Sequence, residues 1–127
     1  MTRHAKWLLW VAAAWNFLGG ASALVDPAGH FSLLYASALN LDDPLQLFFF
    51  RCTWINVMAW GVGYGFAALD SGSSRAILRA GAAGKLVYFG ACASLYLAGV
   101  GKVMLLASGV IDVVFAVLFL ILVARRE

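Results

Sequence analysis

Four long apolar segments constrain the fold of this chain more than any other feature. They cover residues about 7–25, 45–69, 76–98 and 103–124, and each can supply the helix of about 20 apolar residues that crosses a bilayer. Only 12% of the residues are charged and the mean hydropathy is +0.90, whereas a soluble domain carries about 25% charged residues. We therefore predict an all-α integral membrane four-helix bundle that forms a single domain over residues 1–127.

A shorter apolar segment at about 31–41 separates the first two predicted spans. From Phe31 onward its apolar residues recur at the i, i+3, i+4 and i+7 spacing of one helical face. The segment is too short to cross a bilayer, so it predicts a short helix lying in the membrane interface. Asp43 and Pro44 follow it, and a capping aspartate before a proline in the first turn predicts the start of the second long helix.

Two other boundaries are open to more than one interpretation. Ala21-Ser22-Ala23 resembles the cleavage site of a signal peptide, but Asn16 and Gly19-Gly20 interrupt the apolar run before it, so we expect a retained first span. A polar turn at residues 70–74 separates the second and third spans, and either Ser73 or Ser74 is expected to cap the third helix.

The charged residues outside the spans predict the topology. Lys102 and Arg51 fall on one side of the membrane together with Asp26, Asp42 and Asp43, and the opposite side holds a basic group. The members of that group are Arg3, Lys6, Arg75, Arg79, Arg125 and Arg126. Because basic loops stay in the cytoplasm, we predict that both termini are cytoplasmic.

Asp112 and Lys85 are the charged residues deepest inside the predicted spans. From the rise of 1.5 Å per residue, Lys85 lies roughly 12–14 Å and Asp112 about 18 Å from the cytoplasmic ends of their helices. A lysine side chain can bridge the remaining difference in depth. A turn of four residues joins the two helices, so they should be antiparallel neighbours. The sequence therefore predicts a Lys85–Asp112 pair.

Further polar residues fall near the same depth, one or more on every predicted span. They are Asn16, Asn56, Tyr88 and Ser108. Polar groups at this depth can simply hold helices together by hydrogen bonds, or they can form a site that binds a ligand or relays protons. We expect Asp112, Lys85, Asn16, Asn56 and Tyr88 to bind or pass a small ligand, an ion or a proton. There are two alternatives. The residues can have a structural role in an accessory or assembly subunit, or the chain can be a membrane-embedded enzyme acting on a lipophilic substrate.

Arg51 lies about 9 Å inside the outer boundary of its span. It can extend outward to lipid phosphates or pair with Asp42 or Asp43, or it can bind an anionic headgroup. The two histidines, His4 and His30, lie outside the spans, and no cluster has the spacing of metal ligands. We predict no cofactor, no metal and no catalytic residue, and the small net charge of +3 does not suggest nucleic acid as a partner.

Four stretches of sequence carry a family resemblance. They are residues 15–20 (WNFLGG), 63–70 (GYGFAALD), 81–86 with Gly81, Gly84 and Lys85, and 112–119 from Asp112 to Phe119. In these stretches, and in size and helix count, the chain resembles small four-span DoxX-like proteins of bacterial inner membranes. The resemblance implies a four-helix bundle in the inner membrane, but no activity. We expect membrane lipid as a partner, a small lipophilic ligand or ion at the polar site, and a homo-oligomer or a larger membrane complex.

Overall fold

The computed structural model describes residues 1–70, 72 and 74–125, and within them every regular element is a helix and there is no strand. Its helices are α1 (Arg3–Val25), α2 (Pro27–Leu34), α3 (Pro44–Leu69), α4 (Ser74–Leu97) and α5 (Val103–Ala124). The all-α prediction is therefore confirmed, and the four long helices overlap the four predicted spans.

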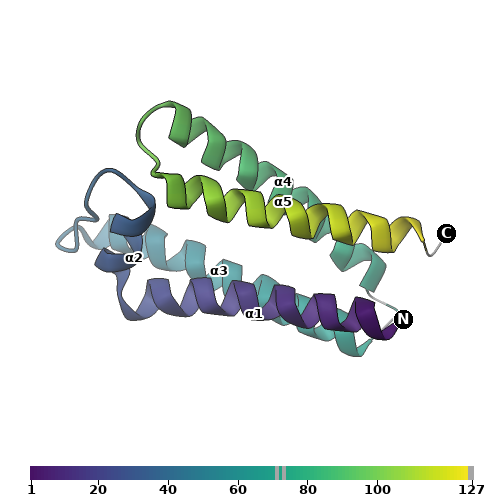
Figure 1. Ribbon diagram of the computed structural model, residues 1–127. Helices are drawn as coiled ribbons and strands as arrows, with labels where there is room; N and C mark the ends of the chain where they lie inside the picture. Colours follow the sequence, from purple (N-terminus) through teal and green to yellow (C-terminus); the bar gives the residue numbers. More distant parts are fainter. Residues whose placement is uncertain (71, 73, 126–127) are drawn as a thin grey trace.

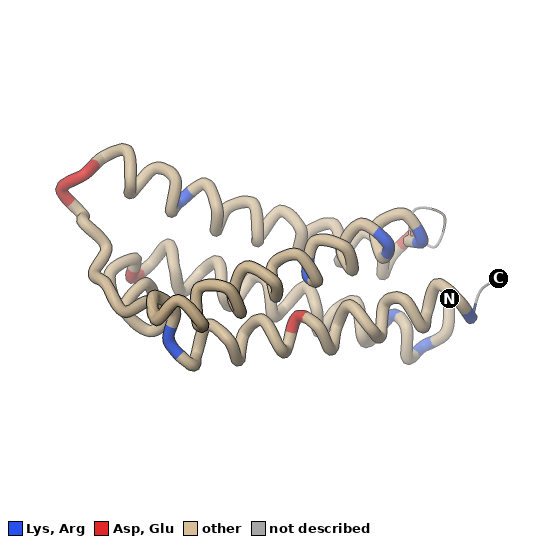
Figure 2. Tube along the Cα trace, turned by 90° about the horizontal axis from the view of Figure 1, so that it is seen from above, with Lys and Arg blue, Asp and Glu red and all other residues tan. Residues whose placement is uncertain are grey.

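The four long helices are arranged as two pairs. α1 packs along α3, and α4 packs along α5, while fewer contacts join one pair to the other. Successive long helices run in opposite directions, so both termini lie at the same end of the molecule, with α2 at the other end (Figure 1). This arrangement brings the start of α1, the start of α4 and the end of α5 together, and Lys and Arg residues gather there (Figure 2). Arg126 lies outside the described residues.

In the part of the chain that the structure describes, two helices are long and apolar enough to cross a membrane. They are α1 and α5, and α5 is the more apolar, with a mean hydropathy of 2.8 against 1.6. Much of the hydrophobic surface of the bundle faces outward: Leu18 is 69% exposed and Val87 is 74% exposed. Membrane spans at α3 and α4 stay a prediction.

The short helix between the first two long ones begins and ends earlier than the predicted segment 31–41. Asp26 caps it by accepting a hydrogen bond from the Gly29 N–H at 3.0 Å, and Pro27 occupies its first turn. After Leu34 the backbone turns extended, because Tyr35 pairs with Gly101 in the connection between α4 and α5. Pairing between these two distant segments therefore outweighs the helical spacing of residues 35–41, and that part of the prediction is wrong.

The predicted start of α3 is confirmed. Asp43 Oδ1 accepts hydrogen bonds from the N–H groups of Leu45 and Gln46 at 3.0 and 3.1 Å, and Pro44 is the first helical residue. At the start of α4, Ser74 is the first helical residue, and Ser73 lies outside the described residues.

We expect Asp43→Ala to lower the free energy of unfolding by about 0.5–2 kcal/mol, because two N–H groups at the start of α3 lose their acceptor. Thermal unfolding in detergent, followed by circular dichroism, measures this change. Asp42→Ala is the matched control, since the Asp42 backbone N–H donates to Asn40 while its side chain caps no helix. Equal loss in both variants would contradict the capping role.

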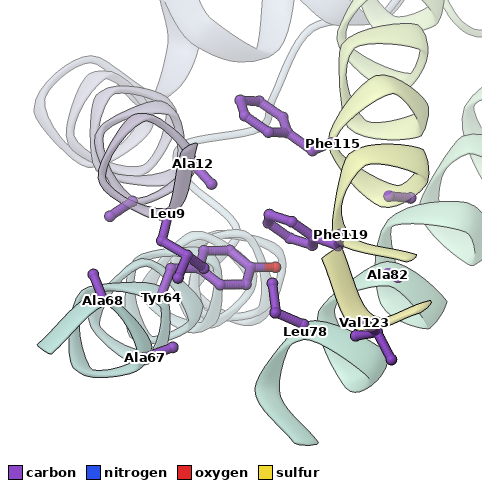
Figure 3. Packing of buried hydrophobic residues seen from close by; sticks show 12 residues of the cluster. Leu9, Ala12, Tyr64, Ala67, Ala68, Leu78, Ala82, Phe115, Phe119 and Val123 are labelled. Atoms are coloured by element: carbon purple, nitrogen blue, oxygen red, sulfur yellow. The ribbon is translucent and has the colours of Figure 1, made fainter. Parts of the chain in front are cut away.

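The main hydrophobic cluster joins all four long helices (Figure 3). Its large members are Leu9, Tyr64, Leu78, Phe115 and Phe119. Small residues line the contact between α1 and α3, where an added Cβ at Gly61 would lie 3.2 Å from the backbone oxygen of Ala13. The two helices of that pair consequently lie close together, whereas aromatic side chains fill the wider space between the pairs.

Candidate functional site

Lys85 and Asp112 form an ion pair inside the bundle. The Lys85 Nζ lies 2.5 Å from Asp112 Oδ1, and the two side chains are only 7% and 13% exposed. The antiparallel pairing of α4 and α5 sets this contact, and a tight turn with Gly99 at φ +75° makes that pairing possible. The depth estimate from sequence predicts the same two partners. Removal of either member of such a buried ion pair strongly destabilises the folded protein, because the other charge is left buried without a partner.

Asn16 connects this ion pair to the other helix pair. Its Nδ2 donates to the backbone oxygen of Val57 on α3 at 3.0 Å, so its Oδ1 faces Lys85 Nζ at 3.4 Å. The Val57 contact determines which way the amide points. Asn16 is 7% exposed. We refer to Lys85, Asp112 and Asn16 together as the polar centre.

Two aromatic rings complete the surroundings of the ammonium group. Lys85 Nζ lies 5.7 Å from the centre of the Tyr64 ring and 5.3 Å from that of Phe115, within the range of cation–π attraction. Tyr64 is almost fully buried and points toward α4 (Figure 3). Its hydroxyl fits there because Gly81 has no side chain: an added Cβ would lie 2.6 Å from that oxygen.

The sequence analysis missed Tyr64 and Phe115 as neighbours of the polar centre. A signal for Tyr64 was present, because it is a large residue between Gly63 and Gly65 on a helix whose other buried positions are Gly61, Ala67 and Ala68. A single bulky side chain on a face of small residues is suited to cross a gap to another helix. Nothing comparable marks Phe115.

Tyr88 forms a second polar contact close to the centre. Its hydroxyl lies 3.2 Å from Ser108 Oγ, and Ser108 itself donates to the backbone oxygen of Leu105 at 2.7 Å. Since a serine hydroxyl has only one proton, the Tyr88 hydroxyl is the donor to Ser108. Ser108 is one helical turn from Asp112. The structure therefore places Tyr88 beside the polar centre, not in direct contact with Lys85.

Asn56 and Arg51 do not join the polar centre. Both side chains are exposed on α3, and Asn56 makes no side-chain hydrogen bond to another described residue. Depth along a helix does not specify the side on which a residue lies, which is why the grouping of Asn56 with Lys85 fails. Arg51 makes no ion pair with Asp42 or Asp43 in the described structure. A contact between Arg51 and a lipid headgroup stays a prediction.

No group of three or more His, Cys, Asp or Glu residues that could hold a metal ion is found among the described residues. Both cysteines are free: Cys92 is buried and Cys52 is exposed. The side chains of the polar centre can form hydrogen bonds, pair their charges and exchange a proton between an ammonium and a carboxylate.

His30 in α2 lies in a separate polar contact at the far end of the molecule. Its Nδ1 is 3.0 Å from Ser22 Oγ, its ring meets Trp54 edge-on with centroids 4.4 Å apart, and its Nε2 is buried without a hydrogen-bond partner. Burial lowers the pKa of His30 below its usual 6.5, against the smaller opposing effect of the Asp26 charge.

This lowered pKa predicts how stability depends on pH. The unfolded chain takes up the His30 proton more readily than the folded chain, so stability present above about pH 6.5 is lost as the pH falls through the lower folded value. Thermal unfolding between pH 7.5 and 5 measures the loss. His30→Gln should flatten this slope, and an unchanged slope in that variant would show that other groups cause it.

The fold and the polar centre together define a class: an all-helical protein in which two helix pairs meet around a buried lysine–aspartate pair. Comparison with protein families, curated proteins and solved structures finds no match to the chain.

Proposed function

We propose that this chain is a four-span protein of a bacterial inner membrane, DoxX-like in architecture, with both termini in the cytoplasm and a polar centre that binds and passes protons. Several observations support the membrane location. α1 and α5 have the length and hydropathy of membrane spans, large apolar side chains cover the outside of the bundle, and basic residues gather at the end that holds both termini (Figure 2).

The 2.5 Å contact between Lys85 Nζ and Asp112 Oδ1 is the observation that carries the proton proposal. Across so short a hydrogen bond, the proton of the ammonium can move to the carboxylate and leave both groups neutral. The ammonium also faces Asn16 and the rings of Tyr64 and Phe115. A larger ligand would have to displace one of these groups, whereas a proton displaces none.

Hydroxyl groups near the polar centre on both sides support passage as well as binding. Toward the end with the termini, the Tyr64 hydroxyl lies against Gly81, one turn before Lys85 on α4. Toward the other end, Tyr88 and Ser108 form their hydrogen bond about one turn beyond it. Hydroxyl groups both donate and accept protons, so this order suits a relay along α4.

The test is proton flux into vesicles that contain the purified full chain and a trapped pH-sensitive dye. A potassium gradient with valinomycin drives the flux, and protein-free vesicles give the background. We expect the wild type to acidify the vesicle interior at least about tenfold faster than background. The flux of Lys85→Met/Asp112→Leu should fall to background, because this variant lacks both groups that exchange the proton. The variant should still fold, since apolar residues can replace a buried ion pair without loss of stability.

Asp42→Asn is the matched control, since it removes a carboxylate at the exposed far end of the bundle, and its flux should equal that of the wild type. Wild-type flux at background, or unchanged flux in the double variant, would contradict the proposal.

A second candidate is a structural role in an accessory or assembly subunit. The connection of the two helix pairs through Asn16 and Lys85 favours it, because such contacts fix how helices pack in lipid. This role predicts background flux in the wild type and co-purification with a larger complex from native membranes.

A further inference from the structure

An apolar groove of about 370 Å³ lies between α1 and α3, outside the polar centre. Ala13, Ala14, Gly61 and Gly65 leave space along it. Larger side chains border it, namely Trp10, Phe17, Val62, Phe66 and Leu69, and they are between 37% and 71% exposed. The groove is therefore open to the surroundings of the bundle and almost free of polar atoms.

Two cations lie at the end of this groove. Trp10 follows Arg3 by seven residues and Lys6 by four, so the three side chains share one face of α1. Arg3 and Lys6 are exposed, and neither forms an ion pair with another residue that the structure describes. The groove thus combines an apolar channel with positive charge at the end of the molecule that holds the termini (Figure 2).

We propose that this groove binds an acyl chain of an anionic phospholipid, whose phosphate contacts Arg3 and Lys6. The proposal rests on the proposed membrane location, but it does not depend on proton transfer. Basic residues near a membrane surface attract anionic lipid. A second copy of the chain fits the groove less well, because a two-fold contact places the same surface of both copies together. Arg3 and Lys6 would then face their own equivalents.

Native mass spectrometry of the full chain, titrated with dioleoyl phosphatidylglycerol or dioleoyl phosphatidylcholine, tests this proposal. The two lipids have the same acyl chains and differ in net charge. We expect phosphatidylglycerol to bind more tightly than phosphatidylcholine. Arg3→Gln/Lys6→Gln should remove this difference, with about a fivefold loss of phosphatidylglycerol affinity for each cation removed. Ala14→Leu, at an exposed position in the groove, should weaken the binding of both lipids at least about tenfold.

Gly90→Leu is the control, because it places the same leucine side chain on α4, away from the groove, at a position with no atom within 4 Å of an added Cβ. It should leave lipid binding unchanged. Equal affinity of the wild type for both lipids, or an unchanged affinity in Ala14→Leu, would overturn the proposal. So would a dimer that Ala14→Leu converts to a monomer, since a second copy would then occupy the groove. Proton flux measured on the same variants distinguishes a failure of the lipid proposal from a failure of the proton proposal.

Discussion

Asp112→Leu is expected to lower the free energy of unfolding by about 3–5 kcal/mol, one of the two largest losses of stability that we predict for a single substitution. The substitution leaves the Lys85 ammonium without the carboxylate that lies 2.5 Å from it. Asn16 at 3.4 Å and two aromatic rings stay as neighbours, but none carries a charge. An uncompensated buried charge accounts for a loss of this size.

Adding Lys85→Met should restore most of that stability, because two apolar side chains can replace a buried ion pair at little cost. Unfolding of the two variants in mixed micelles with increasing dodecyl sulfate measures both steps. If the second substitution adds its own loss to the first, the two residues do not depend on each other and the account of the pair is wrong.

Phe119→Ala is expected to lower the free energy of unfolding by about 3–5 kcal/mol as well, for a different reason. Phe119 is fully buried, and its ring centre lies 5.2 Å from that of Tyr64 on α3 and 6.2 Å from that of Phe115. Truncation would leave a cavity where the two helix pairs meet, and the rings that flank Lys85 would lose support. The same detergent titration measures the change.

Leu118→Ala is the control for Phe119→Ala. Leu118 is the preceding residue of α5 and is 38% exposed, so its truncation leaves no enclosed cavity and should change stability by less than about 1 kcal/mol. Similar losses at the two positions would show that Phe119 does not hold the helix pairs together.

Much of the fold could be predicted from local signals in the sequence. Long apolar runs located the long helices, and the pattern of Asp43 followed by Pro44 located the start of α3. The same pattern at Asp26 and Pro27 begins α2, but the helical spacing after Phe31 led to a prediction shifted along the chain. The extended backbone at Tyr35 depends on Gly101, which is too far along the sequence for a local pattern to reveal.

The polar centre could be predicted in part, because depth along a helix follows from residue number. Depth was sufficient for Lys85 and Asp112, since the short α4–α5 connection makes their helices neighbours. For Asn16 and Asn56 it was not sufficient. The structure brings Asn16 to Lys85 and leaves Asn56 exposed, and the rotation of each helix depends on packing that involves all four long helices.

The most direct test of the polar centre is a solid-state NMR measurement of contacts between lysine Nζ and aspartate carboxylates in lipid bilayers. The chain has three lysines, Lys6, Lys85 and Lys102. Among the residues that the structure describes, it predicts a short contact of 2.5 Å between Lys85 Nζ and Asp112 Oδ1, which should disappear in Lys85→Met and in Asp112→Asn. A spectrum without this contact, or one in which it persists in both variants, would contradict the account.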